Sequence, residues 1–177
     1  MHIGSQGELT RAEALENCRK NLKRVVETLD VGFDYRLCIE TMGRFYAIGD
    51  YVEICGLCAV DARVKPTLDF GHINCLMQGG LREAGETEKI MDYCLEHLGR
   101  EKMQNVHIHF SPIKFGSKGE LAHMNFADAP EKFTPPFEPL AKYIREHDFT
   151  PVIICESSER MAQDAVLLKK MFEGDTK

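Results

Sequence analysis

Carboxylates and histidines recur where four apolar segments of the chain end. In chain order these residues are Glu40, Asp69, His72, His107, His109 and Glu156. Carboxylate oxygens and imidazole nitrogens are ligands that suit Zn²⁺ and Mn²⁺, and a bridging carboxylate can hold two ions close together. Any one such residue alone is more often a solvated side chain, a helix cap or a hydrogen-bonded core histidine. Four such ends in succession favour a shared divalent-metal site.

The cysteines indicate neither a second metal site nor a disulfide framework. There are seven of them, an odd number, and several lie in apolar periodic stretches, where free cysteine behaves as a small buried hydrophobe. Cys55 and Cys58 form a lone CxxC within an apolar helical pattern, which is a weak zinc signal. A reduced, cytoplasmic compartment is therefore expected. His97 and His147 fall near predicted helix ends and are given no catalytic role.

The four apolar segments have strand patterns, and helical patterns lie between them. The predicted strands are residues 35–40, 64–70, 105–110 and 151–156. The predicted helices are residues 10–29 with a capping box of Thr10 and Glu13, 46–59, 86–98, one from residue 137, and a last one capped by Ser157 or Ser158. Strands and helices that alternate without hairpin turns predict a parallel sheet with helical crossovers. No glycine-rich phosphate loop follows a strand, which weighs against a dinucleotide-binding sheet.

The position of the candidate ligands favours a (β/α) barrel over an open doubly wound sheet, the other fold built from parallel strands and crossover helices. In a (β/α) barrel, residues from several strand ends converge on the C-terminal rim, where the active site lies. The chain places its carboxylates and histidines at successive strand ends. The predicted fold class is therefore α/β, of the (β/α)8 TIM-barrel type.

The composition is that of one globular domain over residues 1–177. Of these residues 44% are hydrophobic and 28% are charged, enough for one sizeable core and too few for two comfortable domains. No apolar run approaches the ~20 residues that span a bilayer, and no export signal is visible, so no membrane association is expected. The net charge of −6 weighs mildly against extensive contact with a phosphate backbone, whose affinity comes largely from Lys and Arg.

Five stretches of the sequence together resemble one family of metal-dependent barrels. They are His2-Ile3-Gly4-Ser5, Ile39-Glu40-Thr41, Leu68-Asp69-Phe70-Gly71-His72, Val106-His107-Ile108-His109 and Ile154-Cys155-Glu156, in that order. Their order and spacing resemble the endonuclease IV-like branch of the xylose isomerase-like barrels, over nearly the whole chain. The resemblance implies that the chain is the C-terminal portion of a TIM barrel, about strands 5–8, because barrel strands one to three are absent and strand four survives only as its end.

The resemblance also implies a set of metal ligands. They are His2, Glu40, Asp69, His72, His107, His123 and Glu156. Glu40 and Glu156 would be the catalytic residues, with Glu40 bridging two ions and positioning water; zinc is the expected metal and manganese the alternative. His109 and Lys114 would contact substrate. The family has an Asp two residues before its loop histidine, where this chain has Leu121, so the third ion loses a carboxylate unless Glu120 reaches it.

The segment from Ser111 to Pro136 is predicted to be a long loop without an element of its own. Loops of this length are often functional. It is therefore expected to cover the mouth of the site and to bring His123 toward His72. Its Lys114 and Lys118 would then face an anionic ligand.

The function that the resemblance implies is metal-dependent cleavage on the 5′ side of an abasic site in DNA. The alternative is a sugar isomerase or epimerase of the same superfamily, which acts on a small sugar with one ion held by two Glu, an Asp and a His. A third alternative is a non-catalytic half-barrel scaffold. Four parallel strands cannot close a barrel and leave open edges. We therefore expect the chain alone to be a poor enzyme that pairs with a second copy or with a missing N-terminal half.

Overall fold

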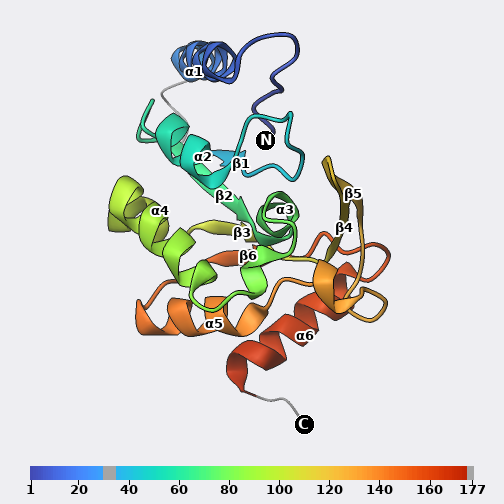
Figure 1. Ribbon diagram of the computed structural model, residues 1–177. Coiled ribbons are helices and arrows are strands. Elements are labelled where there is room, and N and C mark those ends of the chain that lie inside the picture. The colour runs from blue at the N-terminus through green and yellow to red at the C-terminus, as the bar shows by residue number, and fades with distance from the viewer. Residues whose placement is uncertain (30–34, 175–177) are drawn as a thin grey trace.

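Four parallel strands form the sheet at the centre of the molecule (Figure 1). They are β1 (Leu37–Glu40), β2 (Val64–Asp69), β3 (His107–His109) and β6 (Val152–Ile154), in the order β1-β2-β3-β6. Each neighbouring pair is parallel. The computed structural model describes residues 1–29 and 35–174. Within them, the predicted α/β class with a parallel sheet is confirmed.

Helices alternate with these strands. They are α1 (Arg11–Thr28), α2 (Tyr51–Cys58), α3 (Phe70–Leu76), η1 (Gly80–Arg82), α4 (Glu86–Met103), η2 (Glu131–Phe133), α5 (Phe137–Glu146) and α6 (Met161–Glu173). The predicted capping box of Thr10 and Glu13 is present before α1. The cap predicted for α6 is wrong, because its N-cap residue is Arg160, which makes no side-chain capping bond.

The helix predicted from residue 46 begins later than expected, at α2. Asp50 caps α2, with its side chain accepting the backbone N–H of Glu53, and the Glu53 carboxylate in turn accepts the N–H of Asp50. Gly49, just before the cap, has a φ of 140°, which a residue with a side chain rarely adopts. Residues 44–48 therefore form a loop beside the sheet.

The two faces of the sheet carry different side chains, because successive residues of a strand point to opposite sides. Leu68 of β2 and Ile108 of β3 point to the face of the sheet that packs against α4 and α5, which we call the outer face; the opposite face is the inner face. Both side chains are fully buried in the largest apolar cluster, together with residues of these helices. Asp69 and His109, which are paired in register, point to the inner face. The outer face is thus a core, and the inner face carries the polar residues.

The strand predicted at residues 151–156 is not covered on both faces. Ile153 of β6 packs against the apolar cluster, but Val152 and Ile154 on the inner face are 55% and 41% exposed. In the described sheet β6 has one neighbour, β3, so nothing in that sheet covers these two side chains. An apolar pattern like that of residues 151–156 is typical of a parallel strand covered on both faces, but this strand is covered on one.

The segment from Ser111 to Pro136 contains an element of its own, so the prediction of a plain loop is wrong. Its antiparallel hairpin consists of β4 (Ile113–Gly116) and β5 (Gly119–His123). The hairpin packs against α3, a helix that was not predicted, on the side where β2 ends (Figure 1). A side chain at Gly71 of α3 would collide with the backbone oxygen of Ser111 and the side chain of Ile113, at 2.4 and 2.8 Å. This close approach fixes the hairpin over the strand ends.

At the opposite end of the sheet, one lysine connects α4 to the start of β2. Lys102 Nζ donates to the backbone oxygens of Cys58, Asp61 and Val64. An ammonium group has three N–H donors, so each donor has one acceptor. Lys102 therefore links the end of α2, the turn that follows it and the first residue of β2.

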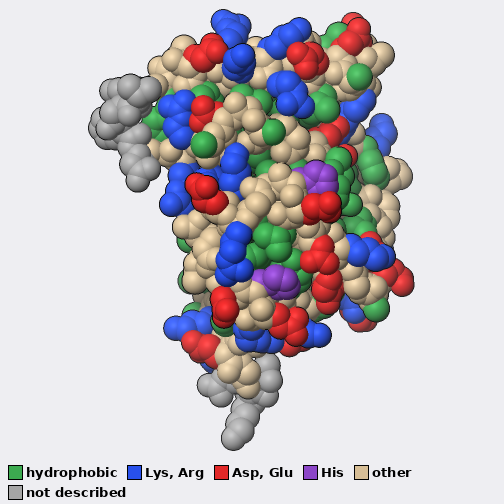
Figure 2. All heavy atoms as spheres, turned by 90° about the vertical axis from the view of Figure 1, so that its left-hand side faces the viewer, with side chains coloured by type: hydrophobic (Ala, Val, Ile, Leu, Met, Phe, Trp, Pro, Cys, Tyr) green, Lys and Arg blue, Asp and Glu red, His purple; other side chains and the backbone are tan. Residues whose placement is uncertain are grey.

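The described helices and the surface charge bear on membrane and nucleic-acid binding. No helix within residues 1–29 and 35–174 is long and apolar enough to cross a membrane. On the face seen in Figure 2, basic and acidic side chains are interspersed. That face therefore lacks the extended basic surface on which phosphate-backbone affinity usually rests.

Candidate metal centre

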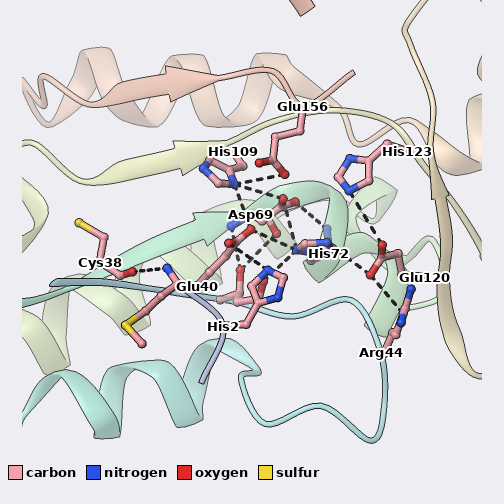
Figure 3. Close-up of polar contacts among 12 residues, drawn as sticks. His2, Cys38, Glu40, Arg44, Asp69, His72, His109, Glu120, His123 and Glu156 are labelled. Atoms are coloured by element: carbon pink, nitrogen blue, oxygen red, sulfur yellow. Dashed lines mark hydrogen bonds and ion pairs between the residues drawn. The ribbon is translucent and has the colours of Figure 1, made fainter. Parts of the chain in front are cut away.

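Four side chains from successive strand ends gather on the inner face of the sheet (Figure 3). They are Glu40, Asp69, His109 and Glu156, which we call the strand-end group, and one potential ligand atom of each lies within 4.8 Å of the others. His109 Nδ1 is 3.0 Å from Glu40 Oε1 and 3.5 Å from Glu156 Oε2. Asp69 and His109 share a row of the parallel sheet. Glu40 pairs with Thr67, which lies two residues before Asp69 in β2. The Glu40 side chain is longer than that of Asp69 and extends toward the C-terminal ends of the strands.

His107 lies outside this group, so its expected place there is corrected in favour of His109. His107 pairs with Thr67 and Val152, about 6.6 Å nearer the start of the strand than His109 at ~3.3 Å per residue. Among the described residues it makes no ion-pair contact with a carboxylate, and its ring centroid is 5.0 Å from that of His109. Strand periodicity puts both histidines on the inner face. The register with Asp69, which the sequence does not reveal, decides which one meets the carboxylates.

The strand-end group has unusual electrostatics. Burial alone would lower the pKa of His109, but the adjoining Asp69 and Glu40 carboxylates raise it to about 10. Burial alone would raise the pKa values of Glu40 and Asp69, but the neighbouring histidines bring both below their ordinary values. The carboxylates are therefore ionised at neutral pH although they are buried, and a positive charge among them is strongly favoured.

A second group lies next to the first and consists of His72, Glu120 and His123, which we call the hairpin group. Asp69 places His72, because its Oδ1 accepts the backbone N–H of His72 at 2.8 Å and so caps α3. His72 Nδ1 lies 2.9 Å from the backbone oxygen of Thr41. A carbonyl oxygen only accepts, so Nδ1 carries a proton and is the donor; Nε2, on the other side of the ring, lies 3.6 Å from Glu120 Oε2. Metal-binding histidines are commonly oriented by such a bond to the backbone.

A β-bulge explains how Glu120 supplies the missing carboxylate. In the hairpin Phe115 pairs with Glu120 and Lys114 pairs with Ala122, which leaves Leu121 as the extra residue of β5. An extra residue shifts the alternation of the strand by one position. Glu120 and His123 therefore lie on the same side although they are three residues apart, and Leu121 is 59% exposed. The Glu120 carboxylate therefore lies beside His72 and His123, which is the arrangement it would need in order to replace the absent Asp.

Two glycines allow the hairpin to lie against the loop that follows β1. Gly119 has a φ of 96°, and a side chain there would be 2.2 Å from the backbone oxygen of Gly43. A side chain on Gly43 would be 2.6 Å from the ring of His72. Between these contacts the backbone N–H of Glu120 donates to the Gly43 oxygen at 2.7 Å. The hairpin group is therefore fixed by backbone packing, in addition to its own side-chain contacts.

The remaining predicted site residues lie at the border of these groups or outside them. His2 Nε2 is 3.4 Å from Glu40 Oε2, but its side chain is 63% exposed and belongs to neither group. Its position follows from Met1, whose backbone bonds to both Cys38 and Glu40 of β1. Lys114 is exposed and, as the neighbour of Ile113 in β4, points to the hairpin face opposite His123. Its role with substrate stays a prediction.

The donor set fits divalent metal ions. Asp69 is fully buried, yet its Oδ2 has no hydrogen-bond partner in the described part of the chain. This oxygen lies 3.3 Å from His72 Nδ1, which also contacts the Thr41 oxygen, and 3.7 Å from His109 Nδ1. His123 Nδ1 is a second buried polar atom without a partner among the described residues. Such atoms are costly unless something binds them. Ligand bonds of ~2.0–2.2 Å require only small side-chain movements within groups that span 4.8 Å.

Comparison with known proteins gives two matches. A family model described as a xylose isomerase-like TIM barrel matches residues 1–171. The protein MJ0133 of Methanocaldococcus jannaschii, described as uncharacterized, is 27% identical over 172 residues. That match covers 97% of this chain and 61% of MJ0133, so the chain corresponds to only part of this relative.

Proposed function

The chain belongs to the xylose isomerase-like TIM barrel family, and we propose that it forms the metal centre of an endonuclease IV-like phosphodiesterase that acts at abasic sites in DNA repair. The observation that carries the proposal is the hairpin group beside the strand-end group. His72 connects them, since its Nδ1 is 3.6 Å from Glu40 Oε1 and its Nε2 is 3.6 Å from Glu120 Oε2. Two adjoining donor groups suit a hydrolase that uses more than one ion.

Each group would have its own part in the reaction. Bound zinc or manganese would supply Lewis acidity toward a phosphodiester and make water a better nucleophile near neutral pH. Glu40 lies within reach of His109, His72 and His2, which suits a carboxylate shared between ions. Glu156, whose side chain is 41% exposed, lies at the open side of the group, where substrate would arrive. Asp69 is buried beneath them and holds the geometry by capping α3.

A sugar isomerase or epimerase is the second candidate, because the strand-end group alone has the composition that such enzymes use. It contains two Glu, an Asp and a His, with His109 in place of the His107 expected from the sequence. In this alternative one ion binds at the strand-end group, and the hairpin group serves the substrate. If neither group binds metal, the third candidate, a non-catalytic scaffold, is favoured.

We also propose that the four strands are the second half of an eight-stranded barrel. The inner face of β6 is exposed at Val152 and Ile154, and Met1 bonds along the free side of β1 as a parallel neighbour does. Both edges therefore fit further strands, from a second copy or from an N-terminal half. Sedimentation of the purified chain is expected to show association; a stable monomer that cleaves abasic DNA efficiently would contradict this.

The experiment that tests the proposed function combines metal content with activity. The chain is stripped with a chelator, reloaded with zinc or manganese, and incubated with duplex DNA that contains one abasic site. We expect two or more ions per chain, and a slow, metal-dependent nick on the 5′ side, made by the associated chain, that is lost in Asp69→Asn, which keeps a side chain able to cap α3. One ion per chain together with aldose–ketose interconversion would instead support the isomerase. No bound ion would overturn both.

A further inference from the structure

The loop that follows β1 lines a cavity beside the metal centre, and this cavity contains a positively charged side chain, that of Arg44. Arg44 and Tyr46 of the loop line it together with His2 and Glu120, and its volume is about 340 Å³. His2 contacts Glu40 of the strand-end group, and Glu120 belongs to the hairpin group. A ligand in this cavity would therefore adjoin both groups of candidate metal ligands (Figure 3).

The guanidinium of Arg44 has donors to spare. Its Nη1 donates to the Tyr46 hydroxyl at 3.2 Å, and its Nε lies 3.5 Å from Glu120 Oε2. A guanidinium has five N–H donors, and across the described residues Nη2 makes no hydrogen bond. The side chain is 44% exposed, so the free edge is accessible. A planar pair of N–H donors matches two oxygens of a phosphate group.

The loop is held in place on both sides before any ligand arrives. Toward the N-terminal segment, the backbone N–H of Gln6 donates to the Tyr46 oxygen at 2.7 Å. Toward the hairpin, the Phe45 N–H donates to the Lys118 oxygen at 3.4 Å. Arg11 also donates to the Phe45 oxygen at 3.1 Å while it pairs with Glu53. Little ordering is therefore left for binding, and a preorganised site loses less affinity to conformational entropy.

We propose that Arg44, together with the Tyr46 hydroxyl, forms a phosphate-binding subsite that selects phosphate-bearing substrates at this metal centre; the proposal rests on the proposed function. Phosphate fits better than a carboxylate, because it has enough oxygens to be shared between the guanidinium and a neighbouring ion. Arg44 is the only Lys or Arg among the described residues that line the cavity. Lys114 lies on the opposite face of the hairpin and cannot take its place.

A competing role for Arg44 is to position Glu120, and the two roles differ in what a substitution changes. A positioning residue would affect metal uptake, because Glu120 belongs to the hairpin group. A residue of the phosphate subsite would leave metal uptake unchanged and affect anion affinity. Metal content and phosphate affinity must therefore be measured on the same variants.

The test is calorimetric titration of inorganic phosphate into the zinc-loaded and the chelated chain. We expect Arg44→Gln to weaken phosphate binding at least tenfold and Tyr46→Phe a fewfold, with unchanged zinc content. Lys142→Gln, a control at an exposed lysine of α5 that does not line the cavity, should stay within twofold of the unmodified chain, and acetate should bind far more weakly than phosphate. Competition by a small sugar phosphate or by abasic duplex DNA then identifies the source of the phosphate.

Each outcome decides for or against the subsite. Phosphate affinity that is unchanged in Arg44→Gln overturns it, and so does zinc loss in Arg44→Gln, which would make Arg44 a positioning residue. Arg44-dependent phosphate binding without any nicking supports the subsite and counts against the nuclease. If the chain takes up no zinc, the proposed function fails, and the Arg44 dependence measured on the chelated chain decides the subsite separately.

Discussion

The charged side chains at the two ends of the central sheet have different partners. Where β2 starts, the Lys102 ammonium has three backbone oxygens around it, one for each N–H donor. Where β2 ends, Asp69 is fully buried, and its Oδ2 has no hydrogen-bond partner among residues 1–29 and 35–174. Instead of fixed backbone partners, this oxygen has two titratable neighbours, His72 Nδ1 at 3.3 Å and His109 Nδ1 at 3.7 Å. We infer that the lysine serves stability and that the carboxylate serves a ligand.

The neighbours of these two charged groups also differ. Around Lys102 the contacts are backbone atoms, which do not depend on the identity of the side chains. Around Asp69 the contacts are Glu40, His72 and His109, and in the chain without metal the imidazole of His109 provides the compensating charge, since its pKa is raised to about 10. The negative charge at this end is therefore balanced by a cation that can be exchanged, which is protonated His109 in the chain without metal and would be a metal ion once one binds.

The largest effect is expected from Asp69→Asn. The substitution removes a charge from the strand-end group and keeps the cap of α3, because Asn caps helices about as well as Asp. Zinc affinity should fall by more than about 100-fold, beyond the ~10–100-fold typical of residues that only orient a ligand. Calorimetry with zinc checks this, and urea unfolding of the metal-free variant should stay within ~1 kcal/mol of the unmodified chain. If the variant bound zinc as tightly as the unmodified chain, Asp69 would not be a metal ligand, and the proposed difference between the two ends of the sheet would be wrong.

Glu120→Gln should have the next largest effect. The amide keeps the shape of the side chain and loses the charge of the hairpin group, so about one ion per chain should be lost while the strand-end group keeps its own. Metal content measured by mass spectrometry after dialysis checks the loss. A variant that binds as many ions as the unmodified chain would show that the hairpin group is no ligand set.

Lys102→Met should affect stability alone. It leaves three backbone oxygens without their donor, which costs about 1–3 kcal/mol of unfolding free energy where water does not replace it. Urea denaturation of the metal-free chain measures the loss. Zinc content and phosphate affinity should not change, and a parallel loss of zinc would show that the two ends of the sheet are not independent.

The smallest effect is expected from deletion of Leu121, the extra residue of the bulge. Without it Glu120 and His123 would be two residues apart, and regular strand alternation would keep both on the same side. Zinc content should therefore remain near that of the unmodified chain. In the Glu120→Gln background, Leu121→Asp should not restore the lost ion, because this position points to solvent. Restoration would show that the bulge does not orient β5.

The sequence predicted the parallel sheet and most of the candidate ligands, because strand patterns and strand-end residues are local features. It did not distinguish His109 from His107, since that choice depends on the register between β2 and β3. It missed the hairpin in residues 111–136, whose pairing depends on packing against α3. Arg44 was missed for a related reason: its loop is shaped by the N-terminal segment and the hairpin, which are distant in sequence.

The measurement that tests the central claim most directly is X-ray diffraction from zinc-loaded crystals, recorded at the zinc absorption edge. We expect two anomalous peaks. One is bounded by Glu40, Asp69, His109 and Glu156, and the other by His72, Glu120 and His123. In Asp69→Asn crystals the first peak should disappear. Zinc found only at other histidines, such as His97 or His147, with both groups empty, would contradict the central claim.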